Sequence, residues 1–199
     1  GSRQLMEPFA ITLARNGYTA VSFDFLGHGD NAEPLTGDIT TVEGATQRLL
    51  DELDRVIGFA RGLEGAEGRV ALLGHSMATD IVARRAVTGD DIAATVAVSM
   101  GPRTVESVVT ADAPRNLLVV SGEWEAPLRE AALEAVEAAA GAPAEEGVSY
   151  GSFADGTARR AVAAPNVEHV GVLYSPTSLR EAHAWLDAAF GLGPGPGEP

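Results

Sequence analysis

The sequence predicts an α/β fold in which a mostly parallel, doubly wound sheet is flanked by helices. Short apolar runs that are typical of buried strands alternate along the chain with longer segments of helical spacing. One serine, Ser76, lies in a Gly-His-Ser-Met-Ala sequence between such a run and a helical segment. The 199 residues, of which 45% are hydrophobic, are sufficient for one domain with a substantial core.

The first third of the chain is predicted to hold a helix, a strand, a loop and a second helix. Apolar residues at helical spacing indicate a helix over 3–16, and Asn16-Gly17 is typical of a C-terminal cap. Residues 18–23 are rich in β-forming side chains and predict a strand, and residues 24–40 predict a loop. Thr40 and Glu43 have the spacing of a capping box, from which a helix is expected to run to about residue 60.

The rest of the chain alternates between strands and helices. Apolar runs predict strands at 70–73, at 92–98, at 116–120 and, around an Asp155-Gly156 turn, one or two within 148–164. Helices are expected from Ser76 to Thr88-Gly89, from Pro127 to about Ala140, and after a Ser175-Pro176 cap. The connection between residues 98 and 116 is too short for a lid domain.

Charge makes nucleic acids and anionic membrane surfaces poor partners for this chain. The 14 basic and 28 acidic residues give a net charge of −14. Such a chain repels polyanions. The acidic residues are spread along the sequence, which indicates a solubility feature rather than an interaction tail.

The sequence also excludes cysteine chemistry and a membrane-spanning helix, and it leaves the cellular compartment and the oligomeric state open. The sequence contains no cysteine, so disulfides, thiolate chemistry and cysteine-ligated metals are excluded. No apolar stretch approaches the length of a membrane-spanning helix. The start of the sequence has no secretory signal pattern, which slightly favours a cytoplasmic location but leaves the compartment open, as it does the oligomeric state.

The last nine residues differ in composition from the rest. Residues 191–199 form a Gly/Pro-rich run that cannot pack, and we interpret them as a tail or linker, with a frayed natural end as the alternative. Residues 1–190 are predicted to form the folded domain.

The sequence around Ser76 is typical of a nucleophile elbow. In this strand-to-helix turn the serine adopts a strained conformation, and its hydroxyl projects from the sheet. Large side chains two residues before and after the serine would collide, which explains Gly74 and Ala78. Ala78 departs by one methyl group from the glycine that is usual at the second position.

A serine nucleophile needs a base, and the base needs an orienting acid. In a parallel sheet these groups must lie on loops at the carboxyl ends of strands. Two downstream segments meet this demand: Ser121-Gly-Glu-Trp-Glu125 after one predicted strand, and Val167-Glu-His-Val170 before the last helix. The order along the chain is therefore serine, acid, histidine.

The chain resembles the α/β-hydrolase superfamily over nearly its whole length. The resemblance rests on Gly74-His-Ser-Met-Ala78, Asn16-Gly-Tyr18, Asp24-Phe-Leu-Gly-His-Gly29, Pro114-Arg-Asn-Leu-Leu-Val-Val-Ser-Gly-Glu-Trp-Glu125, and Glu168-His169 with the later Trp185-Leu186. It implies an α/β-hydrolase domain over residues 1–190 that lacks its N-terminal strand or strands and a lid.

By this resemblance Ser76 is the nucleophile, His169 the general acid and base, and Glu125 the orienting acid. Glutamate departs from the commoner aspartate by one methylene group. Glu123 and Asp155 are alternatives for the orienting role. The resemblance implies a small-molecule acyl substrate and no cofactor.

The oxyanion of a tetrahedral intermediate requires two backbone N–H donors. Met77, which follows the nucleophile, is expected to supply one. The loop that supplies the second donor in the family, typically beginning His-Gly, is not found in the sequence. We favour truncation before Gly1 as the explanation, with a remnant of the loop at Gly1-Ser2 or loss of the donor as alternatives.

The other histidines are poorer candidates for a base. His28 is expected to brace a glycine turn, His75 to point away from Ser76, and His183 to pack on a helix. Asp24 is expected to cap the glycine turn. The histidines do not have the spacing of metal ligands, so no metal is predicted.

Two classes of function follow. The first is a lidless serine hydrolase that cleaves a carboxylic ester, or a related thioester or peptide-like acyl bond. The second is a catalytically inactive hydrolase-fold module used for binding, which Ala78, the glutamate and the missing oxyanion loop favour. An acyltransferase or lyase on the same scaffold cannot be distinguished from the first class by sequence.

Overall fold

The computed structural model describes residues 2–38 and 41–196. The chain divides into two compact units, residues 1–68 and residues 69–199. The assignment of residues 1–190 to one hydrolase domain and of residues 191–199 to a tail stays a prediction.

The first unit contains helices and loops. Its elements are η1 (Arg3–Met6), α1 (Glu7–Arg15), η2 (Val42–Thr46) and α2 (Gln47–Arg61). The strand expected at 18–23 is not formed, because a strand requires a neighbour with which to exchange hydrogen bonds, and no strand pair among the described residues includes this segment. The expectation of a strand at this position was wrong.

The start of α2 also differs from expectation. Thr40, the first member of the expected capping box, lies outside the described residues. The regular helix begins only at Gln47, because Gly44 in η2 has non-helical angles of φ −87° and ψ −120°. A Cβ atom on Gly44 would lie 2.9 Å from the backbone nitrogen of Asp38, so glycine permits this close approach.

The second unit is built on a five-stranded sheet with the order β1-β2-β3-β5-β4. The strands are β1 (Val70–His75), β2 (Ile92–Val98), β3 (Leu117–Gly122), β4 (Ser149–Tyr150) and β5 (Arg159–Ala164). All neighbours are parallel except β4, which pairs antiparallel with β5. The mostly parallel α/β fold predicted from the sequence is confirmed.

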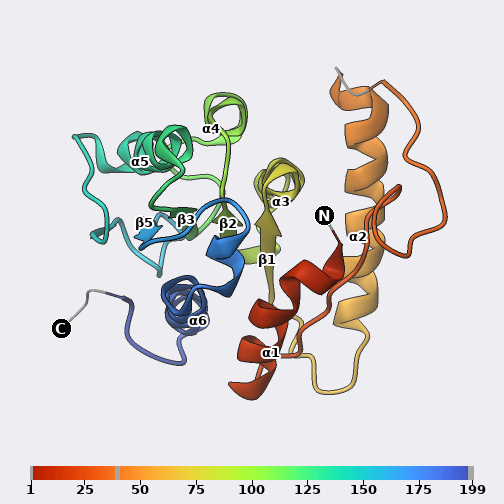
Figure 1. Cartoon of the computed structure of the whole chain (residues 1–199). Helices are drawn as coiled ribbons and strands as arrows, with labels where there is room; N and C mark the ends of the chain where they lie inside the picture. The colour runs from red at the N-terminus through yellow and green to blue at the C-terminus, as the bar shows by residue number, and fades with distance from the viewer. Residues whose placement is uncertain (1, 39–40, 197–199) are drawn as a thin grey trace. The chain divides into compact units, whose positions relative to one another are not determined.

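Helices cover both faces of this sheet (Figure 1). Helices α3 (Met77–Val87), α4 (Pro102–Val108) and α5 (Ala126–Ala140) lie on one face, and α6 (Pro176–Ala189) lies on the other. A short 3-10 helix, η3 (Gly171–Tyr174), precedes α6. Helix α4 was not predicted. Its seven residues begin with Pro102 and are too few to produce a clear helical period.

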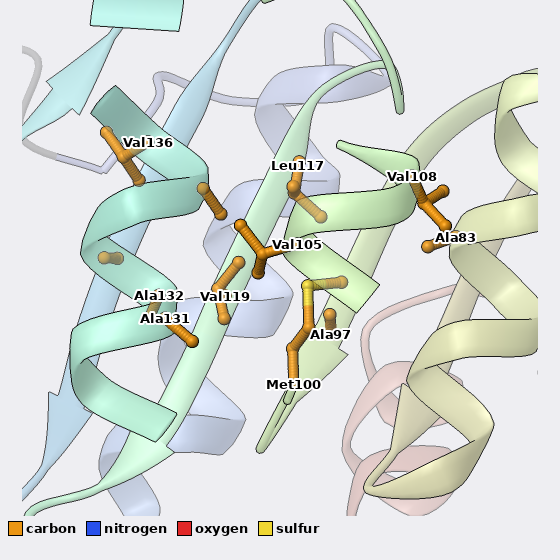
Figure 2. Close-up of a cluster of buried hydrophobic side chains, with 12 residues drawn as sticks. Ala83, Ala97, Met100, Val105, Val108, Leu117, Val119, Ala131, Ala132 and Val136 are labelled. Atoms are coloured by element: carbon orange, nitrogen blue, oxygen red, sulfur yellow. The ribbon is translucent and has the colours of Figure 1, made fainter. Parts of the chain in front are cut away.

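The core beneath α3, α4 and α5 consists of small and branched side chains together with Met100 (Figure 2). Ala131, Ala132 and Ala135 of α5 lie against β3 and β5, and small side chains let the helix approach the sheet closely. On the other face, Trp185 of α6 is fully buried and donates its indole N–H to the carbonyl of Asn116 at 2.8 Å. This packing fixes the strands whose carboxyl ends carry the predicted site residues.

In the described part of the chain, every helix falls short of the length and apolar character needed to cross a membrane.

Candidate active site

Ser76 lies at the junction of β1 and α3. Its backbone angles, φ 57° and ψ −125°, are sparsely populated by residues that carry a side chain. Its N–H donates to the carbonyl of Val98 at 2.9 Å, and its carbonyl accepts the N–H of Thr79 at 2.9 Å. Hydrogen bonds from both flanking elements therefore hold the strained turn.

Gly74 has the steric role that the sequence predicted. A Cβ atom on Gly74 would lie 2.9 Å from the carbonyl oxygen of Ala78 and 3.0 Å from a methyl group of Val82. Any side chain at position 74 would therefore push the first turn of α3 away from β1.

Glu125 lies just beyond the carboxyl end of β3, at the residue that precedes α5. Its side chain is buried, with 7% of the residue exposed. Oxygen Oε2 accepts two hydrogen bonds, from the N–H of Gly122 at 2.6 Å and from the hydroxyl of Ser99 at 2.8 Å. These donors compensate the loss of water around a buried carboxylate.

His169 lies on the loop between β5 and η3, with 44% of its side chain exposed. Its Nδ1 is 2.5 Å from Oε1 of Glu125, and its Nε2 is 2.8 Å from Oγ of Ser76. Because a carboxylate only accepts, Nδ1 carries the proton and Nε2 of the neutral ring accepts from the serine hydroxyl. The three predicted side chains thus form one row of hydrogen bonds.

Nearly the whole chain matches one known protein family. Residues 3–196 match the sequence model that describes the alpha/beta hydrolase family. The chain belongs to the alpha/beta hydrolase family. Family membership suggests hydrolase activity in general. Among curated proteins, none matches the chain.

The two alternative acids of this family member have other partners. Oε2 of Glu123 accepts the N–H of Asn166 at 2.7 Å. Asp155 accepts the N–H of Thr157 at 3.0 Å and its hydroxyl at 2.6 Å, and these hydrogen bonds lower the pKa of Asp155. Of the three candidates, Glu125 is the one hydrogen-bonded to His169.

Ser99 is a residue at the site that sequence reasoning missed. It follows β2, has a positive φ of 57°, and donates its N–H to Val120 at 2.7 Å. This turn places its hydroxyl on the carboxylate of Glu125. Register pairs Val98 with Val120, so Ser99 lies beside the end of β3. The sequence shows a serine after an apolar run, but it does not show that Glu125 is the partner of this serine.

The loop that carries His169 is organised by Glu168. The carboxylate of Glu168 accepts the N–H groups of Val170 at 2.8 Å and Gly171 at 2.9 Å. These two backbone donors lower the pKa of Glu168 from its usual 4.5, since they favour the charged form. The loop is also held by the N–H of Trp124, which donates to Val167 at 3.1 Å.

The remaining histidines have distinct surroundings. Nδ1 of His28 lies 3.0 Å from the carbonyl of Leu26, within the glycine turn that it was expected to brace. His183 lies 3.2 Å from Asp187 one turn later in α6. The ring of His75 contacts the loop of His169, and its expected direction away from Ser76 stays a prediction.

The described residues contain no group of three histidine, aspartate or glutamate side chains arranged to hold a metal ion. Asp24, expected to cap the glycine turn, accepts the N–H of Asp30 at 3.0 Å and that of Arg3 at 2.6 Å.

Proposed function

We propose that this chain is a serine hydrolase that cleaves a carboxylic ester, or a related acyl bond, of a small molecule through an acyl-enzyme. The observation that carries the proposal is the row of hydrogen bonds from Glu125 through His169 to Ser76, at 2.5 Å and 2.8 Å. Such a row converts a weakly nucleophilic hydroxyl into an activated one.

In the acylation step, Oγ of Ser76 attacks the carbonyl carbon while Nε2 of His169 takes the hydroxyl proton. The tetrahedral intermediate collapses, the carbon–oxygen bond to the leaving group breaks, and the imidazolium gives its proton to the departing alcohol. A water molecule then attacks the acyl-enzyme, with His169 again accepting the proton. Release of the acid returns the proton to Ser76.

Glu125 is proposed to hold the imidazole in the reactive tautomer and to stabilise the imidazolium that forms. Its burial and its two fixed donors, Gly122 and Ser99, restrict the carboxylate to one position. From its position directly before α5, the longer side chain of glutamate brings Oε1 to 2.5 Å from Nδ1 of His169.

Met77 is proposed as one oxyanion donor. It is the first residue of α3, and the first N–H groups of a helix have no partner within the helix. The positive end of the helix dipole also favours an anion at this point.

The proposal is tested by reaction of the full chain with a fluorophosphonate probe. We expect covalent labelling at Ser76, located by peptide mass spectrometry, which is lost in Ser76→Ala. His169→Ala should lower the labelling rate by about 10⁴-fold or more, because the hydroxyl then has no base. Circular dichroism establishes that each variant is folded. A folded wild-type protein that is not labelled would overturn the proposal and favour the non-catalytic binding module.

Untreated wild-type protein should also hydrolyse p-nitrophenyl esters, since the same serine nucleophile that reacts with the probe would form the acyl-enzyme. Labelling without turnover of any ester in a panel of short and long acyl chains would contradict the hydrolytic step.

A further inference from the structure

His75, the last residue of β1, makes a hydrogen bond that the proposed mechanism does not use. Its Nε2 lies 2.8 Å from the backbone carbonyl oxygen of His169. A carbonyl oxygen only accepts, so Nε2 of His75 carries the proton and donates. Burial lowers the pKa of His75, because desolvation disfavours the imidazolium, and the ring is therefore a neutral donor at neutral pH.

The two imidazoles also contact each other directly. The ring centroids of His75 and His169 are 4.7 Å apart, and the rings are tilted by 43°. His75 therefore contacts both the main chain and the side chain of His169.

The hydrogen bond from His75 to the carbonyl of His169 anchors the His169 loop at a second place in the fold. Other hydrogen bonds of the His169 loop, from Trp124 to Val167 and from Asn166 to Glu123, tie it to the turn that carries Glu125. The hydrogen bond from His75 ties the loop to β1, the strand that carries Ser76. The loop is thus anchored on the side of the acid and on the side of the nucleophile.

We infer that His75 is a positioning residue, whose Nε2–H holds the main chain of His169 so that the imidazole lies between Glu125 and Ser76. This inference rests on the proposed function for its effect on rate. A displacement of about 1 Å in a reacting group lowers rates by about 10²-fold. Loss of the donor should therefore slow the reaction of Ser76 without abolishing it.

Two variants distinguish the effect of the Nε2–H donor of His75 from the effect of its ring contact with His169. His75→Phe keeps an aromatic ring next to His169 but removes the donor. His75→Gln removes the ring but keeps an N–H at about the distance of Nε2. We expect His75→Phe to lower the fluorophosphonate labelling rate by about 10- to 100-fold, and His75→Gln to stay within about threefold of the wild type.

A spectroscopic measurement tests the position of His169 without any reaction. The short hydrogen bond between Nδ1 of His169 and Glu125 should give a low-field proton resonance, which Glu125→Gln assigns by removing it. We expect this resonance to broaden or shift in His75→Phe and to persist in His75→Gln. Thermal unfolding establishes that both variants are folded.

The outcomes distinguish this inference from the proposed function. If the wild type is not labelled but the resonance responds to His75→Phe as expected, the proposed function fails and the positioning role stands. If the wild type is labelled, an unchanged rate and resonance in His75→Phe would overturn the positioning role alone. Equal losses in both variants, or a rate loss with an unchanged resonance, would also overturn it.

Discussion

Two glutamates, Glu52 in the first unit and Glu125 in the second, are almost equally buried, with 8% and 7% of each residue exposed. Each accepts a backbone N–H through Oε2, Glu52 from Leu26 at 2.9 Å and Glu125 from Gly122 at 2.6 Å. They differ at Oε1, which meets the side-chain amide of Asn31 in one case and the imidazole of His169 in the other.

This difference separates a structural carboxylate from a candidate catalytic one. The amide of Asn31 does not titrate and also donates to the backbone carbonyl of Asp24, so the hydrogen bonds of Glu52 hold a loop. The imidazole of His169 can accept and release a proton, and its other nitrogen meets Ser76. Burial of a carboxylate alone therefore does not indicate a catalytic role.

Among substitutions of these carboxylates, the largest effect is expected for Glu125→Gln. The amide cannot stabilise an imidazolium, and its rotation can present an N–H to His169, which favours the wrong tautomer. We expect the rate of ester hydrolysis to fall on the order of 10⁴-fold.

The matched control is Glu123→Gln, on the same turn. It should lower the rate by no more than about threefold, because the partner of Glu123 is the backbone of Asn166. A larger loss in Glu123→Gln than in Glu125→Gln would reverse the assignment of the orienting acid.

Glu52→Gln should change stability and leave the chemistry intact. One of its two acceptor oxygens becomes a donor that faces another donor, which costs about 1–3 kcal/mol in the free energy of unfolding. Urea denaturation measures the loss, and the labelling rate of Ser76 in the folded variant should equal that of the wild type. A tenfold slower labelling rate at unchanged stability would show that the two glutamates are not functionally distinct.

The smallest effect concerns Glu168, an exposed carboxylate beside His169. Its pKa is lowered in the folded chain, so its hydrogen bonds stabilise the loop above the usual value of 4.5, and this stabilisation is lost as the pH falls through the lowered pKa. We expect faster hydrogen exchange at the amides of Val170 and Gly171, relative to the intrinsic rate, as the pH falls through the lowered pKa of Glu168. Glu168→Gln should remove this pH dependence, and an equally steep dependence in that variant would contradict the explanation.

Much of the second unit could be predicted from its sequence because each strand there is a short apolar run bounded by turn residues. The elbow was predicted from the local sequence Gly74–Ala78, and the two loops at 121–125 and 167–170 followed from the rule that parallel strands end at one edge. The choice of Glu125 and His169 within those loops rested on the family resemblance. The strand expected at 18–23 failed because β-forming side chains do not supply a pairing partner.

The partners of Ser99 and His75 could not be predicted for a related reason. Each lies at the end of a strand, but the atom it contacts belongs to a segment 26 or 94 residues away. Those contacts depend on register and on the path of a loop, neither of which has a local pattern in the sequence.

At Ser76 the positive φ lowers the stability of the fold, while the side chain that causes this cost carries the hydroxyl of the proposed activity. A residue with a side chain in such a conformation costs about 1–3 kcal/mol, and glycine would relieve most of that cost. Laboratory evolution that rewards heat resistance alone would therefore favour glycine at this position and discard the hydroxyl. A thermostable descendant of this chain has to be selected for turnover in the same round.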